Sequence, residues 1–494
     1  MKIILFLFCI LLINSIEKKL EINEDEIIQR IKSIVGNKAA PLLAGGLAII
    51  KDSKTIFCRS LGSARLNPNG TENMTATENV KYRTASISKL FTAIGIWQLE
   101  EKGLLNVTDE ASKYLGFELK NPYFPNIPIT INMLLSHTSS IREGNYNVPY
   151  NHHISEYFNE SSEIYYEGCY SKEHEPGYYQ YVNMNYCLLG TIIERVSNVR
   201  FDLYMIENVL KPMGITGSFN IFELPKEQLD ETGSLYEKLT DGKFDVNGKF
   251  TVRMDDFTEG YPTANYSEYV IGTNGALYGP MGSLRISLEE LTHLAHMFIN
   301  NGTYNGKVIL KPETIEKMFT IIWRYDENKK NGETDDGYDY AYAGGPSIIT
   351  NIGKNRLHEK KNLQFSGHTA NAYGLFGGVF FDRTKGCGLV YRGNGVSRSL
   401  DEYVGSFSPY NQWALDFIKL ADDVAQFDYP ENKKEDEHVE PPPEDDSFPI
   451  YIIIIIAFFG LAIIVSFIVI LILKRKQYFE SQDTDDKKEQ ISEE

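Results

Sequence analysis

Apolar and polar residues along the chain form two patterns, one typical of β-strands and the other typical of amphipathic helices. Two apolar runs near the start are separated by a short polar turn, which predicts a β-hairpin. Between residues 86 and about 211 the apolar positions have mainly helical spacing. The expected strands are 42–50, 55–61, 374–382 and 388–391, and the expected helices include 129–136, 188–197, 287–300, 311–319 and 411–427.

The order of these elements predicts the α+β fold class. Strands at the start and end of the folded region should pair in one antiparallel sheet, because no regular strand pattern separates them. The helices should cover the faces of this sheet and form a second, helical lobe. We expect the functional site in the groove between the lobes, where the helix that begins at Ser86 meets an edge strand.

Each end of the chain carries its own apolar segment. Residues 1–15 have one early lysine and an apolar run too short to cross a bilayer, which predicts a secretory signal peptide. Residues 450–473 hold no charged residue and would be roughly 36 Å long as a helix, enough to span the hydrocarbon. Acidic residues precede this segment and Lys474-Arg475-Lys476 follows it, which predicts a cytosolic C-terminus.

The expected organisation is therefore that of a single-pass type I membrane protein, at the cell surface or in an endomembrane. Its folded domain would lie outside the cell or in a lumen, bound to the membrane through the C-terminal helix. The expected parts are a signal peptide (1–15), a folded domain (24–428), an acidic, proline-containing stalk (429–449), a transmembrane helix (450–473) and a cytosolic tail (474–494).

Composition narrows the function and agrees with a secretory route. The formal net charge of −18 argues against a nucleic-acid partner, which would require a basic face. Four cysteines would remain after signal cleavage, and the sequence leaves open whether they form disulfides or stay as free thiols. They are Cys58, Cys169, Cys187 and Cys387, and six glycosylation sequons begin at Asn69, Asn73, Asn106, Asn159, Asn265 and Asn301.

The motif Ser86-Ile87-Ser88-Lys89 is the main candidate for chemistry. Residues three apart on a helix share a face, so Lys89 should stand beside Ser86 and act as its base. A serine at the start of a buried helix also has a free backbone N–H for a developing oxyanion. Two further motifs follow, Tyr181-Val182-Asn183 and His368-Thr369-Ala370.

Together these motifs make the chain resemble the beta-lactamase-related serine hydrolases. This family comprises class C beta-lactamases, low-molecular-weight D-alanyl-D-alanine peptidases and related esterases. The resemblance covers roughly residues 40–420 and implies the same α+β fold. The matching segments, in family order, are 82–93, 131–139, 176–190, 280–283 and 367–369.

The resemblance implies a role for each motif. Ser86 would be the nucleophile that forms an acyl-enzyme, and Lys89 would hold or take its proton. Tyr181 would share the base role and pass the proton to the leaving group. Asn183 would hydrogen-bond Lys89 and the substrate amide.

The last motif would contact the substrate along a strand. His368 stands where the family has lysine or histidine, and its charge would favour a substrate carboxylate in a pH-dependent way. Thr369 would hydrogen-bond the same carboxylate. The backbone N–H groups of Ser86 and Asn371 are the expected oxyanion hole.

The sequence departs from the family pattern at two glycines. Ala370 replaces one, and its methyl group either narrows the pocket or points to the other face of the strand. Ser140 replaces another, just after His137, which we interpret as structural.

These features predict a membrane-anchored serine hydrolase that acts on a small ester or peptide-like amide. The resemblance implies no cofactor, and no Cys/His spacing suggests a zinc site. Two alternatives stay open: a beta-lactamase or D-alanyl-D-alanine peptidase proper, and a catalytically silent receptor or scaffold.

Overall fold

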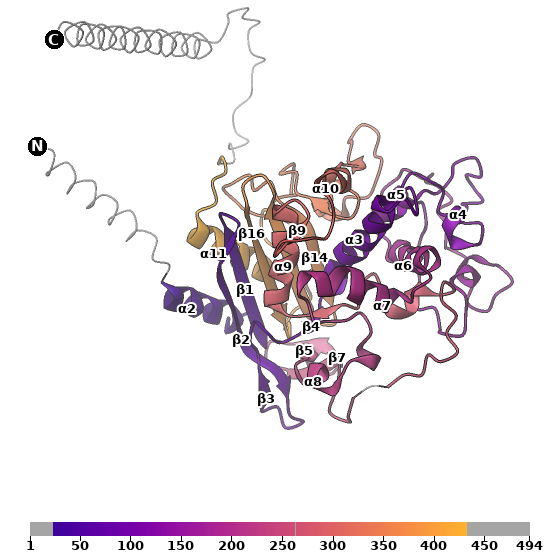
Figure 1. Ribbon diagram of the computed structural model, residues 1–494. Helices are drawn as coiled ribbons and strands as arrows, with labels where there is room; N and C mark the ends of the chain where they lie inside the picture. Colours follow the sequence, from indigo (N-terminus) through magenta and orange to yellow (C-terminus); the bar gives the residue numbers. More distant parts are fainter. Residues whose placement is uncertain (1–22, 262, 432–494) are drawn as a thin grey trace, which may run out of the picture. The chain divides into compact units, whose positions relative to one another are not determined.

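The computed structural model describes residues 23–261 and 263–431 (Figure 1). The predicted signal peptide, transmembrane helix and cytosolic tail lie outside these residues, as does most of the predicted stalk. Within the described ranges, no helix combines the length and the apolar character that crossing a membrane would require.

A nine-stranded antiparallel sheet organises the fold and confirms the predicted α+β class. The strands, in spatial order, are β11 (Trp323–Arg324), β12 (Ala341–Tyr342), β13 (Ser347–Ile348), β14 (Ser366–Ala372), β15 (Leu375–Asp382), β16 (Cys387–Asn394), β1 (Ala44–Lys51), β2 (Lys54–Leu66) and β3 (Glu72–Thr75).

The start and the end of the folded region pair in the centre of this sheet, as predicted. β1 pairs with β16 from Ala44 opposite Asn394 to Ile50 opposite Gly388. β1 also forms the expected hairpin with β2. Its central turn residues Asp52 and Ser53 both have positive φ, +50° and +58°, as the tight hairpin turn that matches strand twist requires.

Alternate residues of the central strands enter two separate hydrophobic cores, which explains why these strands read as continuous apolar runs. Leu47 and Ile49 of β1 pack beneath α2 (Glu24–Val35) and α11 (Gln412–Ala425). Ala48 and Ile50 face the opposite side, where α9 (Leu288–Ile299) covers the sheet (Figure 1). Helices thus cover both faces of the central strands, which leaves a site room only where a strand is not fully paired or covered.

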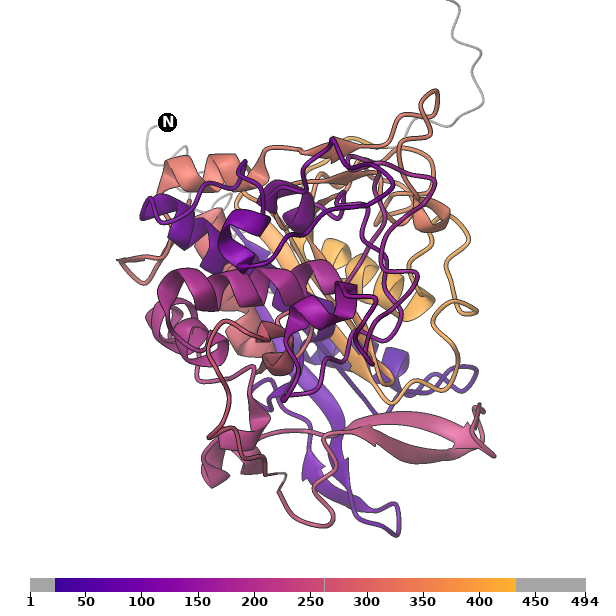
Figure 2. The same cartoon turned by 90° about the vertical axis from the view of Figure 1, so that its right-hand side faces the viewer.

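The second lobe is helical and continues the core beneath α9. Figure 2 shows its purple and magenta helices in front of the sheet. The helices of the lobe and those that join it to the sheet are α3 (Ser88–Glu101), α4 (Ser112–Leu115), α5 (Ile131–Leu135), α6 (Met184–Ser197), α7 (Phe201–Met205), α8 (Lys226–Asp230) and α10 (Pro312–Phe319).

Small strand pairs connect the lobes. β4 (Tyr82–Arg83) pairs with β8 (Arg285–Ile286) just before the motif of Ser86. A three-stranded ribbon formed by β5 (Leu235–Thr240), β6 (Lys243–Phe244) and β7 (Lys249–Met254) and the pair β9 (Thr303–Tyr304) and β10 (Lys307–Val308) complete the strands of the described chain.

The prediction of mainly helical structure between 86 and 211 is wrong for its middle. Residues 136–183 form loops with one short 3₁₀ turn, η2 (Ile154–Phe158). Pro149 and Pro176 interrupt the apolar positions within this segment. Because proline lacks an N–H and fixes φ, an apolar spacing of helical type cannot continue as a helix there.

The cysteines and sequons have clear positions. All four cysteines of the described chain are free thiols, three buried and Cys58 partly buried, which decides between the two alternatives that the sequence left open.

The asparagines of all six sequons are exposed, as an attached glycan requires. Glycosylation itself stays a prediction.

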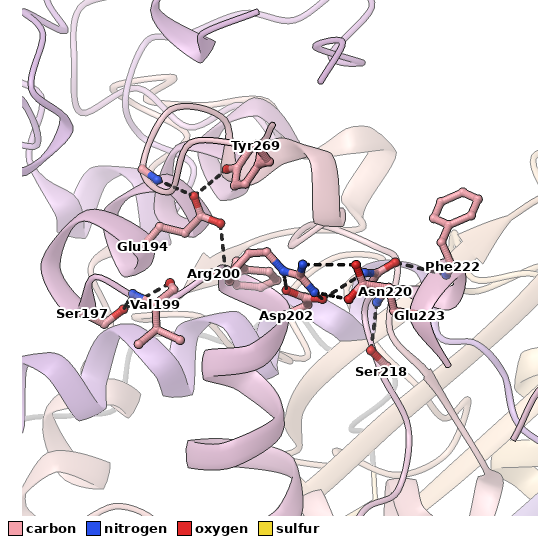
Figure 3. A network of polar contacts seen from close by, with 12 residues as sticks. Glu194, Ser197, Val199, Arg200, Asp202, Ser218, Asn220, Phe222, Glu223 and Tyr269 are labelled. Atoms are coloured by element: carbon pink, nitrogen blue, oxygen red, sulfur yellow. Dashed lines mark hydrogen bonds and ion pairs between the residues drawn. The ribbon is translucent and has the colours of Figure 1, made fainter. Parts of the chain in front are cut away.

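A buried polar network ties the helical lobe together (Figure 3). Glu194 of α6 is fully buried and accepts hydrogen bonds from the Phe201 N–H at 2.9 Å, the Tyr269 hydroxyl at 2.6 Å and the Gly272 N–H at 2.8 Å. Burial raises the pKa of Glu194, while these three donors lower it. One carboxylate therefore joins α6, the start of α7 and the loop before residue 272.

The Glu194→Ala substitution should lower the free energy of unfolding by about 3 kcal/mol, because three donors lose their buried acceptor. Urea denaturation of the full-length chain, followed by circular dichroism, measures this change. Glu207 is an exposed control on the same lobe, and among the described residues its side chain pairs only with Lys211, at 3.1 Å. Its alanine variant should cost less than about 0.5 kcal/mol, and an equal loss in both variants would contradict the assignment.

Candidate active site

Ser86 and Lys89 lie at the junction of a 3₁₀ turn and a helix. Ser86 is in η1 (Ala85–Ile87), which runs directly into α3. The preceding Ala85 has φ +44°, a left-handed conformation that favours glycine. This turn positions the Ser86 hydroxyl 3.0 Å from the Lys89 ammonium nitrogen, as the three-residue spacing predicts.

The Lys89 side chain is fully buried and has three polar neighbours. Besides Ser86, Nζ contacts the Asn183 side-chain oxygen at 2.7 Å and the Met281 carbonyl oxygen at 2.9 Å. The last two groups are acceptors only, so they always require N–H donors. A neutral amine has two N–H groups and one lone pair. With both hydrogens directed to Asn183 and Met281, its lone pair faces the Ser86 hydroxyl.

Burial makes this neutral state accessible near physiological pH. Loss of hydration lowers the pKa of Lys89 from 10.5 to about 7, and the nearby Glu143 carboxylate works in the opposite direction. Half of the lysine is then unprotonated near neutrality. Lys89 can therefore take the proton of Ser86 directly.

Glu143 is a site residue that the sequence did not reveal. Its carboxylate accepts the Asn183 side-chain N–H at 2.8 Å and the Met184 backbone N–H at 2.7 Å. Because the amide nitrogen of Asn183 is held by Glu143, its oxygen must face Lys89. Burial raises the pKa of Glu143, and Lys89 and these N–H groups lower it.

Tyr181 lies beside Ser86 and over Lys89. The Lys89 ammonium nitrogen is 4.9 Å from the centre of its ring. Its hydroxyl has no partner at hydrogen-bonding geometry among the described residues. Burial raises the pKa of Tyr181 well above 10, and the neighbouring Ser86 hydroxyl lowers it. The tyrosine is thus a neutral hydroxyl with a free position next to the serine.

His137 supports this tyrosine, in agreement with the structural role expected for it. Its ring stacks on Tyr181 with centroids 4.3 Å apart. Its Nδ1 accepts the Val182 N–H at 3.1 Å, which fixes the backbone between Tyr181 and Asn183. Burial, Lys89 and His368 lower the pKa of His137 well below 6.5, so the ring is neutral.

His368, Thr369, Ala370 and Asn371 lie on β14 and line the same cavity as Ser86. β14 is not an edge strand of the whole sheet, contrary to expectation, since β13 lies beyond it. Within the described chain, however, β13 pairs with β14 only at Ser366 and Gly367. The rest of this side of β14 has no paired strand and lies against η1.

His368 is neutral, which changes its expected role. Burial and the Lys89 charge lower its pKa from 6.5 to about 3. Its Nδ1 donates to the Thr369 carbonyl oxygen at 2.8 Å, so Nε2 holds the lone pair. His368 therefore supplies an acceptor, not the cation that carboxylate recognition would need.

Both replaced glycines fit the structure. The Ala370 side chain is in the core below the sheet, opposite Gly377, which has no side chain to oppose the methyl group. Ser140 has φ +62°, the region where glycine is usual, and its buried hydroxyl accepts the Asn121 amide N–H at 3.0 Å. Ser140 is not among the residues that line the cavity, whereas Ala370 is.

The cavity beside Ser86 has a volume of about 620 Å³, in the range of small-molecule sites. It receives Ser86, Tyr181 and Asn183 from the helical lobe and the β14 residues from the sheet. In the described part of the chain, no group of three or more His, Cys, Asp or Glu side chains is arranged to hold a metal ion. The cavity therefore gives a small molecule access to the Ser86 hydroxyl, with the Lys89 amine 3.0 Å from it.

Comparison with known proteins agrees with this arrangement. A sequence profile of the family described as Beta-lactamase matches residues 30–403. Protein flp of Staphylococcus aureus is 29% identical over 172 residues, which are 34% of this chain and 33% of that protein. Penicillin-binding protein 4* of Bacillus subtilis is 29% identical over 225 residues, 44% of this chain and 45% of that protein. The alignments thus span a third to less than half of these relatives.

Among solved structures, the octameric penicillin-binding protein homologue from Pyrococcus abyssi has a TM-score of 0.55 at 22% identity. The alignment covers 81% of this chain and 77% of that one. At this identity the likeness shows a common fold.

The rate at which a fluorophosphonate modifies Ser86 should rise with pH around a midpoint near 7. Protonated Lys89 cannot accept the serine proton, so reactivity is low below its pKa of about 7 and full above it. Intact-mass measurement of the adduct at several pH values gives the profile. Lys89→Ala should abolish this step, and exposed Lys102→Ala should keep it; a flat wild-type profile would contradict the lysine-base assignment.

Glu143→Gln should lower the plateau of this profile about tenfold, because the Asn183 amide loses its fixed orientation. It should also move the midpoint to lower pH, since the Glu143 charge raises the pKa of Lys89. The exposed Glu175→Gln is a matched control. A lower plateau with an unmoved midpoint would indicate only a structural role for Glu143.

Proposed function

The chain belongs to the beta-lactamase family of serine hydrolases, and from this premise we propose that it hydrolyses esters or amides through an acyl-enzyme on Ser86. The observation that carries the proposal is the environment of Lys89. Its two fixed acceptors leave one position of the amine for the Ser86 hydroxyl at 3.0 Å.

Acylation would begin when neutral Lys89 takes the Ser86 proton as Oγ attacks the substrate carbonyl carbon. The carbonyl oxygen becomes an oxyanion, for which the backbone N–H groups of Ser86 and Asn371 are the proposed donors. Collapse of the tetrahedral intermediate breaks the bond to the leaving group. The ester of Ser86 remains.

Tyr181 would carry the proton to the leaving group. Its neutral hydroxyl lies beside Ser86 with no hydrogen-bond partner in the described chain, so it has free capacity to donate and accept. The proton passes from Lys89 through this hydroxyl to the departing oxygen or nitrogen. Water then attacks the acyl-enzyme by the same steps in reverse order, which regenerates Ser86.

The protonation state of His368 indicates which class of substrate the site can bind. A D-alanyl-D-alanine peptidase must bind the terminal carboxylate of its peptide, and a neutral imidazole offers no charge to it. Burial holds the pKa of His368 at about 3. This supports an enzyme that hydrolyses esters or amides without binding a carboxylate of the substrate, rather than a D-alanyl peptidase.

We also propose that the hydrolase acts outside the cell or in a lumen, anchored by residues 450–473. The charge pattern around this segment and the exposed sequon asparagines support that location. The expected partners are thus a small substrate and the membrane.

A fluorophosphonate and a penicillin, each applied to the full-length chain, test the proposal. One adduct of the fluorophosphonate should map to Ser86, because activated serines react with it. Ser86→Ala should lose the adduct entirely, and the exposed Ser33→Ala should keep it. Peptide mapping by mass spectrometry identifies the site.

An absence of adduct from both reagents, on chain with an unchanged thermal unfolding curve, would refute the hydrolase proposal. The silent receptor or scaffold would then be the better interpretation. A penicillin adduct at Ser86 would instead favour a penicillin-recognising enzyme over an esterase.

A further inference from the structure

Part of the lining of the cavity is strongly acidic. Four carboxylates line it, and the only lining residue of the described chain with a basic ammonium or guanidinium group is Lys354. The carboxylates are Asp335, Asp336, Asp339 and Asp401. We call these four residues the acidic wall.

Three members of the acidic wall are exposed and unneutralised. Asp335, Asp336 and Asp401 have exposed side chains, and no ion pair or side-chain hydrogen bond involves them within the described residues. Partial burial and the charges of Asp336 and Asp401 raise the pKa of Asp335, so both of these carboxylates lie close enough to Asp335 to repel it. An uncompensated group of this kind attracts a positive charge into the cavity.

Asp339 brings negative charge close to the reacting groups. It is buried and accepts the Tyr179 hydroxyl at 2.7 Å and the Ser347 hydroxyl at 3.2 Å, both neutral donors. Its pKa is raised to about 6 by burial, and its charge in turn raises the pKa of Tyr181. A carboxylate near the reaction centre is thus left without a cation.

An unpartnered acceptor in the same cavity points to a donor ligand. His368 is 4% exposed, and its Nε2 has no hydrogen-bond partner in the described chain. Because Nδ1 donates to the Thr369 carbonyl, Nε2 can only accept. The carboxylates do not converge as a metal site among the described residues, so an organic cation with N–H donors fits better.

On the basis of the proposed function, we infer that the acidic wall and His368 bind a cationic group of the substrate. The preferred substrates would then be esters or amides with a free ammonium or guanidinium group near the scissile bond. An N-terminal aminoacyl amide has this chemistry. The same wall would repel substrates with a carboxylate, which deepens the distinction from D-alanyl peptidases.

Three anilides that share one scissile bond test this inference. They are phenylalanine p-nitroanilide with a free ammonium, its neutral N-acetyl form and its anionic N-succinyl form, each as both enantiomers. The full-length chain should show the highest kcat/KM with the free ammonium form, a value roughly tenfold lower with the N-acetyl form, and one roughly tenfold lower again with the N-succinyl form. The preference should weaken as salt is added.

The triple variant Asp335→Asn, Asp336→Asn, Asp401→Asn should reduce the ratio of ammonium to N-acetyl turnover roughly tenfold. Asp52→Asn, an exposed carboxylate in the β1–β2 turn, should leave the ratio unchanged. The three residues of the triple variant are exposed, so it should fold even where a variant of buried Asp339 does not.

Equal turnover of the ammonium and N-acetyl forms, or a preference for the succinyl form, would overturn the inference. A preference that survives in the triple variant would also overturn the role of the acidic wall. Fluorophosphonate labelling of Ser86 in the wild-type chain separates this failure from failure of the proposed function. If Ser86 is labelled but the enzyme shows no preference for the charge of the anilide, only the proposed substrate class is refuted.

Discussion

Burial of one lysine amine is the constraint on which the site depends. Removing Lys89 from water disfavours its charged form, and burial alone would leave an amine with unsatisfied hydrogens. Asn183 and the Met281 carbonyl accept two of these hydrogens, at 2.7 and 2.9 Å. The third hydrogen-bonding position of the amine then faces the Ser86 hydroxyl. Three separate segments are needed for this arrangement, because η1, the residue before α6 and the segment before β8 each supply one neighbour.

The parts of the site that follow local rules could be predicted from the sequence. Ser86 and Lys89 are three residues apart on one helical segment, so their contact follows from helix geometry. Glu143 could not be found in this way. It reaches Asn183 from a loop, after a segment in which His137 and Ser140 have φ +59° and +62°. The spacing of hydrophobic residues does not predict turns of this kind. Glycine usually indicates such a turn in a sequence, and here Ser140 stands in its place.

The fold, like the site, could be predicted from the sequence only in part. The pairing of the first and last strands at the centre of the sheet could be predicted, because β1 and β16 are buried on two faces and their sequences are largely apolar runs. The helical prediction failed between α5 and α6, where Tyr157 of the short turn η2 and other aromatic side chains pack into the core. A buried loop and a buried helix both need apolar residues every few positions. Only tertiary contacts distinguish them, since Pro149 and Pro176 interrupt the apolar spacing of residues 136–183 at two points alone.

The charges of the cavity and the base are physically coupled. Lys89 must be neutral to act on Ser86, and a second positive charge nearby disfavours its protonated form. A cationic substrate held against Asp339 and the rest of the acidic wall would therefore lower the pKa of Lys89 while it is bound. The carboxylates would keep that ammonium in place although the lysine repels it. Substrate charge would then serve both recognition and activation of the serine, a combination that a carboxylate-bearing substrate cannot provide because it would stabilise the protonated lysine.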